Sequence, residues 1–185
     1  MASMKKFVPV VTTLLLLFTC TPNVQAQELA LVIQAPPNIT VTPITDGELD
    51  FGRVVQNQGT VRIQLQDGQT EVIRIEKNLA WWEWLWGGNR QVVVTVNSDN
   101  SLQHGTGTST IPFSLRSAYD NQGETENKQQ AQTFSNSTQF NMPPPWEEPQ
   151  GNVSTAYLYI YGNINVGNDV EAGDYTGIIN INVTD

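Results

Sequence analysis

The residues best suited to catalysis in this sequence are carboxylates, because it holds a single histidine, His104, and a single cysteine, Cys20. Glu147 and Glu148 stand beside Trp146, and paired carboxylates near an aromatic ring are what glycoside hydrolysis uses. Adjacent residues in one loop say nothing about their separation across a cleft, so we interpret the pair as solvated surface. We predict a non-enzymatic protein with no catalytic residues, in which His104 is an exposed turn residue.

Metal binding has one weak candidate. A zinc site needs a cluster of cysteine and histidine ligands, which this composition cannot supply. Asp169, Glu171 and Asp174 lie close together, and carboxylate oxygens hold calcium in extracellular modules. The alternative is an ordinary acidic surface. We predict no metal and no cofactor.

The strongest local anomaly is the segment 81–86, which reads Trp-Trp-Glu-Trp-Leu-Trp. On a strand, Trp82, Trp84 and Trp86 share one face. If that face is exposed, the rings could stack on a polysaccharide or form a subunit interface, where tryptophan is enriched. If it is buried, the rings cap the core of the domain. The sequence leaves both readings open.

The charge balance excludes further classes of protein. Acidic residues number 18 against 9 basic ones, which gives a net charge of −9 and leaves no basic surface for nucleic acid. Asn and Gln together number 33 and outnumber the 27 charged residues. One cysteine cannot build a disulfide framework.

Residues 1–26 have the three parts of a secretory signal peptide. Lys5 and Lys6 precede an apolar run over 7–18, and Ala26 ends a cleavage site of small residues. The run is shorter than the roughly 20 apolar residues of a membrane span, so we predict an exported protein without one. Lipidation at Cys20 is the alternative to cleavage after Ala26. Cleavage would remove Lys5, Lys6 and Cys20, leaving no cysteine and a net charge of −11.

After the leader, apolar residues alternate with polar ones at a period of two, which is typical of half-buried strands. Examples lie at 61–65, 111–115 and 179–183, and no amphipathic helix is visible. Eight or nine short strands of this kind predict an all-β fold, an antiparallel β-sandwich. Asp67-Gly68 predicts a hairpin turn, and the polar, Pro-rich stretch 118–151 predicts a long exposed loop with at most one weak strand near Phe134 or Phe140.

Two motifs resemble those of a known family. Leu49-Asp50-Phe51-Gly52 follows the first strand, and Ala172-Gly173-Asp174-Tyr175-Thr176-Gly177 leads into the last one. Together they are similar to secreted bacterial β-sandwich proteins of the spore coat protein U type and to subunits of archaic chaperone–usher pili. The resemblance implies an immunoglobulin-like sandwich that can be completed by a donated strand, with a periplasmic chaperone and other surface subunits as partners.

That resemblance gives a role to the first segment after the leader. In an N-terminal extension over 27–36, before a domain over 37–185, Leu29, Leu31 and Ile33 would form the inserted row of a donor strand. The alternative is an ordinary first strand buried in its own sandwich. We expect a structural or adhesive, fimbrial subunit at the cell surface; the alternative function is a carbohydrate-binding module that uses the tryptophan row.

Overall fold

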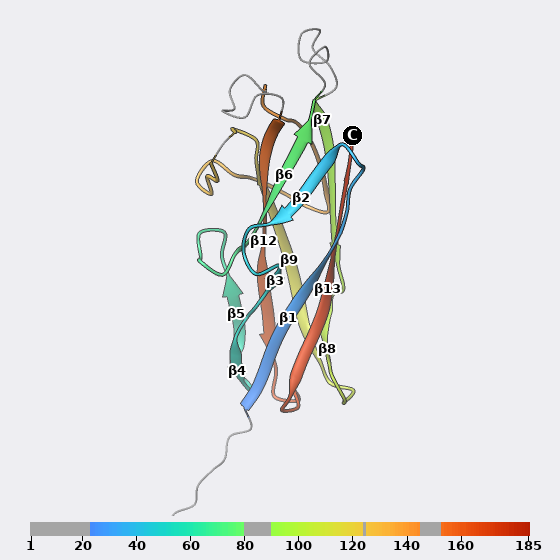
Figure 1. Ribbon diagram of the computed structural model, residues 1–185. Helices are drawn as coiled ribbons and strands as arrows, with labels where there is room; N and C mark the ends of the chain where they lie inside the picture. The colour runs from blue at the N-terminus through green and yellow to red at the C-terminus, as the bar shows by residue number, and fades with distance from the viewer. Residues whose placement is uncertain (1–22, 80–89, 124, 145–152) are drawn as a thin grey trace, which may run out of the picture.

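The computed structural model describes residues 23–79, 90–123, 125–144 and 153–185. Within these ranges the chain forms thirteen strands and no helix, which confirms the predicted all-β fold (Figure 1). No helix that could span a membrane is found in this part of the chain. The strands are β1 (Asn23–Gln34), β2 (Ile39–Pro43), β3 (Glu48–Leu49), β4 (Arg53–Val55), β5 (Gly59–Ile63), β6 (Glu71–Asn78), β7 (Gln91–Ser98), β8 (Ser101–His104), β9 (Thr110–Asp120), β10 (Gln132–Phe134), β11 (Ser137–Asn141), β12 (Val153–Val166) and β13 (Asp174–Thr184).

The strands form one sheet that curls into a sandwich-like half-barrel. Its order is β11-β7-β13-β8-β9-β12-β6-β2, so the β8–β9 pair joins the two halves. β1 lies beside β13, with β3 and β4 on its other edge, while β5 pairs with β12 and β10 with β9. Every pairing is antiparallel except that of β1 with β13, which is parallel. The antiparallel prediction therefore holds for all but this one seam.

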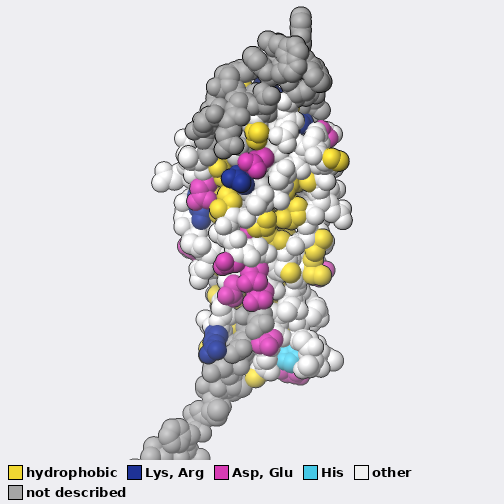
Figure 2. Space-filling view, in the orientation of Figure 1, with side chains coloured by type: hydrophobic (Ala, Val, Ile, Leu, Met, Phe, Trp, Pro, Cys, Tyr) yellow, Lys and Arg dark blue, Asp and Glu magenta, His cyan; other side chains and the backbone are white. Residues whose placement is uncertain are grey.

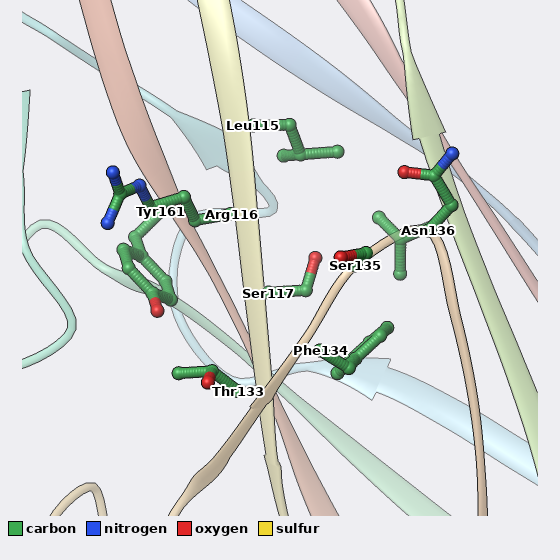
Figure 3. A pocket seen from close by; sticks show the side chains of 9 residues that line it. Leu115, Arg116, Ser117, Thr133, Phe134, Ser135, Asn136 and Tyr161 are labelled. Atoms are coloured by element: carbon green, nitrogen blue, oxygen red, sulfur yellow. The ribbon is translucent and has the colours of Figure 1, made fainter.

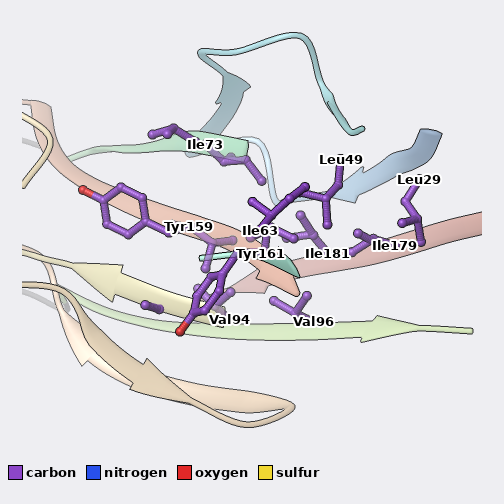
Figure 4. Packing of buried hydrophobic residues seen from close by; sticks show 14 of the residues in the cluster. Leu29, Leu49, Ile63, Ile73, Val94, Val96, Tyr159, Tyr161, Ile179 and Ile181 are labelled. Carbon is purple, nitrogen blue, oxygen red and sulfur yellow. The ribbon is translucent and has the colours of Figure 1, made fainter. Parts of the chain in front are cut away.

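The core fills the space between the two halves. Inward residues of β12, β13 and β7, such as Ile160, Ile181 and Val94, belong to one buried cluster. Figure 4 shows Ile181 and Val94 within it. β12 is buried on both faces, although its sequence alternates Tyr with Leu and Ile. The segment after β9 covers the tyrosine face, and the Asn127 amide donates a hydrogen bond of 2.9 Å to Tyr159 Oη.

Two sequence predictions about connections are wrong. Asp67-Gly68 does not close a hairpin, because β5 and β6 do not pair with each other. Instead both pair antiparallel with successive parts of the long strand β12, so they run in the same direction. The turn is a link between them, in which the Gln64 amide donates to Asp67 Oδ2 at 2.7 Å.

The expected loop 118–151 is too long. β9 continues to Asp120, where Ala118 and Asp120 are buried beside Tyr159 and Tyr157. Both β10 and β11 then lie inside the range. Amide and hydroxyl residues on these two strands face outward, which makes their sequence resemble a loop.

Candidate functional site

The first strand lies inside its own domain, between β13 on one edge and β3 and β4 on the other. β1 runs parallel to β13 in the register Leu29↔Gly177, Leu31↔Ile179 and Ile33↔Ile181, and the two strands lie side by side in Figure 1. Leu29 is fully buried, whereas Leu31 and Ile33 are half-buried. Val32, on the opposite face, is 41 % exposed. The in-chain alternative is thus the arrangement in this structure, and the expected boundary at residue 36 does not separate β1 from the sandwich.

Leu29 is more deeply buried than Leu31 and Ile33, the other two residues of the expected donor strand. It pairs with Leu49 of β3 on one side and with Gly177 of β13 on the other. Figure 4 shows Leu29 and Leu49 together at one end of the core. A β-carbon added to Gly177 would lie 3.0 Å from Leu29 Cδ2 and 2.9 Å from Leu102 Cδ2, which is too close for a side chain. Because Gly177 has no side chain, Leu29 can pack directly against its backbone, and we call this position the seat of Leu29.

The two motifs that carried the family resemblance therefore meet at β1. Within the first motif, Phe51 is buried against Phe113, with ring centroids 5.9 Å apart in an edge-to-face contact. The Gly52 amide donates to Asp50 Oδ1 at 2.6 Å, and Gly52 has a φ of 66°. This turn joins β3 to β4, which run in the same direction because both pair antiparallel with the second edge of β1.

The second motif is held by His104, which the sequence analysis expected to be an exposed turn residue. His104 is half-buried at the end of β8, with Nε2 3.2 Å from the Ala172 carbonyl oxygen. Nδ1 accepts hydrogen bonds from the amides of Gly107, at 2.6 Å, and Thr106, at 3.2 Å. Since Nδ1 accepts, the ring proton is on Nε2, which donates to the carbonyl. The ring thus ties the β8–β9 loop to the β12–β13 loop.

Tyr175 and Gly173 complete this contact. The buried Tyr175 ring meets His104 edge-on at 5.0 Å, and its hydroxyl donates to the Glu171 carbonyl at 3.0 Å. Gly173 has a φ of 149°, and a β-carbon there would collide with the His104 ring. Both glycines of the motif are explained by close approaches. Sequence reasoning missed His104 because an isolated histidine beside glycines carries no pattern.

Carboxylates gather where β1 meets β3. Partial burial, followed by the negative charges of Glu28, Asp50 and Asp46, raises the pKa of Glu48 above its ordinary value. Figure 2 shows acidic side chains grouped below the centre of this face. Like charges that face each other across paired strands weaken the pairing, so the acidic group opposes the docking of this part of β1.

Glu71 belongs to the same region but lies below the surface. It is 1 % exposed, receives a hydrogen bond from the Thr45 hydroxyl, and its Oε1 has no hydrogen-bond partner among the described residues. Burial raises the pKa of Glu71, and its hydrogen bonds with Thr45 and Gly47 offset only part of this effect. A carboxyl that is buried without a cation favours its protonated form.

The remaining predicted site residues do not form a catalytic or metal centre in the described structure. Asp169, Glu171 and Asp174 are exposed, and no group of three or more metal-binding side chains is found in the part of the chain described. Trp82, Trp84 and Trp86 lie outside the described residues, as do Trp146, Glu147 and Glu148.

Comparison with known proteins adds no relative. No family model matches the chain, and no curated protein sequence matches it significantly.

Proposed function

We propose that this chain is a non-enzymatic, exported surface subunit of fimbrial type that assembles by strand complementation, with β1 as the exchanged strand. The observation that carries the proposal is the seat of Leu29 between Leu49 and Gly177. A second copy has the same seat and the same strand. Exchange of β1 between copies would therefore preserve every contact of the seam and link subunits in series.

The connection after β1 is suited to serve as a hinge. Residues 35–38 contain Pro36-Pro37 and join β1 to β2. The far end of this connection is anchored to the domain. Asn38 Nδ2 donates to Asp185 Oδ2 at 2.7 Å, and the Asn78 amide donates to the Asn38 carbonyl at 3.0 Å. Because consecutive prolines favour an extended chain, β1 could project from this anchor toward a neighbour.

Lys77 strengthens the anchor. Its ammonium group lies 3.4 Å from Asp185 Oδ2 and donates to the Gln91 carbonyl at 3.1 Å, although its side chain is only 3 % exposed. The hydrogen bond from Asn38, and after it the charge of Lys77, lowers the pKa of Asp185. These contacts at residue 38 thus involve no residue of β1.

β1 itself is held unevenly. Its segment 31–34 pairs with β13 on one edge, and no pairing of that segment with β3 or β4 occurs. Its beginning pairs with β4 through residues 23–25. Cleavage of the leader after Ala26 would remove this pairing and leave β4 with a free edge. The exported chain would then hold β1 less firmly than the full-length chain does.

The proposal places the protein at the cell surface, with other subunits and a periplasmic chaperone as partners. Electron microscopy of the exported protein tests it, and filaments are expected. A pair of variants compares the buried and the exposed face of β1, and the denaturant unfolding curve of each variant shows whether it still folds. Leu29→Ser removes the seated side chain and should abolish filaments, whereas Val32→Ser changes an exposed position on the same strand and should retain them. An exported wild-type protein that stays monomeric at all concentrations would contradict the proposal.

A further inference from the structure

A second site lies on the side of the half-barrel where β9 changes partners. Along one edge, β9 pairs with β8 as far as Pro112 and with β10 from Ser117 onward. Between these points the amide of Phe113 donates to the Asn100 carbonyl at 2.8 Å, and no other strand pairs with this edge in the described structure. The chain leaves β10 at Phe134 and joins β7 through β11, so the sheet has an opening here.

A cavity of about 430 Å³ occupies this opening (Figure 3). Leu115 and Phe134 supply apolar surface, while Ser117, Thr133 and Asn136 supply hydroxyl and amide groups. Its volume falls in the range of small-molecule sites, roughly 300–1,000 Å³. The mixture of apolar surface and uncharged hydrogen-bonding groups suits a sugar ring, which presents both kinds of surface.

A smaller cavity of about 260 Å³ adjoins the first, because Arg116 and Tyr161 line both. Arg62 and Asn163, which are register partners on β5 and β12, line the smaller one. Arg62 of β5 lines the smaller cavity, and Arg116 of β9 lines both.

Neither arginine has an acidic partner among the residues that the structure describes. The two ion pairs in the described part of the chain are Arg74–Glu76 and Lys77–Asp185, so Arg62 and Arg116 remain unpaired there. Acidic residues outnumber basic ones two to one in this sequence, which makes two unpaired arginines at one place notable. Burial raises the pKa of Tyr161, and the nearby charge of Arg116 partly offsets that rise. The Arg116 guanidinium group thus lies close enough to Tyr161, which lines the cavity, to lower its pKa.

We propose that these two adjoining cavities bind a saccharide unit that carries a carboxylate. Arg116 and Arg62 would pair with the carboxylate, since guanidinium groups match its geometry with two parallel hydrogen bonds. Ser117, Thr133 and Asn136 would bond the sugar hydroxyls, and the Tyr161 ring would contact an apolar face of the sugar. The site shares no residue with the β1–β13 seam, so its failure and the failure of strand exchange are separate results.

Titration of the isotope-labelled full chain with glucuronate, followed by amide NMR shifts, tests the proposal. Glucuronate should shift amides of β9 and of residues 133–136, and glucose and acetate should each bind at least about tenfold more weakly, since each lacks part of the match. Acetate binding as tightly as glucuronate would overturn the saccharide assignment. Absence of any shift with glucuronate at tens of millimolar would overturn the site.

Variants locate the binding. Arg116→Ala should weaken glucuronate binding at least about tenfold, because it removes a charge-assisted pair. Arg53→Ala, which changes an exposed arginine of β4 outside both cavities, should leave it unchanged. Arg116→Lys keeps the charge and should give an intermediate affinity. Equal affinity in all three variants would contradict the assignment of Arg116.

Discussion

Leu29 of β1 rests on the bare backbone of Gly177 in β13: a β-carbon on Gly177 would come within 3.0 Å of Leu29 Cδ2. The two residues are register partners in the parallel pairing of the structure, and they come from segments at opposite ends of the sequence. The contact connects β1, which is the strand proposed to exchange, to the sequence motif that begins β13. In the proposed assembly, the strength of this contact would decide how readily β1 exchanges between copies.

Gly177→Ala should destabilise the docking of β1. The new methyl group would meet Leu29 and Leu102 at distances that force one of them to move, and overpacking of this kind typically costs about 1–3 kcal/mol. Denaturant unfolding measures the loss. Gly68→Ala is the control, because nothing lies within 4 Å of a β-carbon there, and its effect should stay within about 0.5 kcal/mol. Equal stability of the two variants would show that the seat is not tight.

Leu29→Ala and Leu31→Ala should differ clearly in their effect on the free energy of unfolding. Leu29 is fully buried, and truncation of such a leucine costs about 2–5 kcal/mol. Leu31 is half-buried on the part of β1 that has a partner on one edge, so its truncation should cost much less. A larger loss at Leu31 would mean that the burial of β1 is distributed differently.

Lower pH should stabilise the folded protein. The pKa values of Glu71 and Glu48 are raised on folding, so the folded state binds more protons than the unfolded state. Their stabilisation is full below the ordinary glutamate pKa of about 4.3 and is lost as pH rises through the raised values. The pKa of Asp185 is lowered, and that contribution is lost only at pH values below about 3.9.

Unfolding free energies measured between about pH 4.5 and 7.5 test this dependence. Glu71→Gln and Glu48→Gln should each flatten the profile. Asp99→Asn, which changes an exposed residue in the turn between β7 and β8, should keep it. A wild-type stability that rises with pH over this interval would refute the assignment.

His104→Ala should loosen the two loops that its ring connects. The amides of Gly107 and Thr106 would lose their acceptor, and the Ala172 carbonyl would lose a donor. Hydrogen exchange at the Gly107 amide should accelerate, with a loss of global stability of about 1–3 kcal/mol. Unchanged protection at Gly107 would show that the loops hold their shape without the ring.

The sequence predicted the strands better than their partners. Alternation at 111–115 and 179–183 correctly indicated strands because one face of each is buried. The sequence allowed one weak strand near Phe134 or Phe140, whereas the structure has both β10 and β11 there; the signal was faint because Phe140 is the only buried residue of the two strands among amide and hydroxyl side chains. The parallel seam could not be read from β1, which is apolar on both faces. A usable signal was Gly177, since glycine inside a strand pattern indicates a close approach by another chain segment.

A cysteine pair across the seam tests strand exchange most directly. Ala30 and Ile178 are register partners on β1 and β13 and both are exposed, so Ala30→Cys and Ile178→Cys can form a disulfide between neighbouring strands. The chain after the expected leader has no other cysteine. The measurement is a non-reducing gel of the exported double variant after oxidation. Strand exchange should give a ladder of covalent multimers, whereas each single variant cannot go beyond a dimer. Monomers with an internal disulfide alone, at every protein concentration, would contradict it.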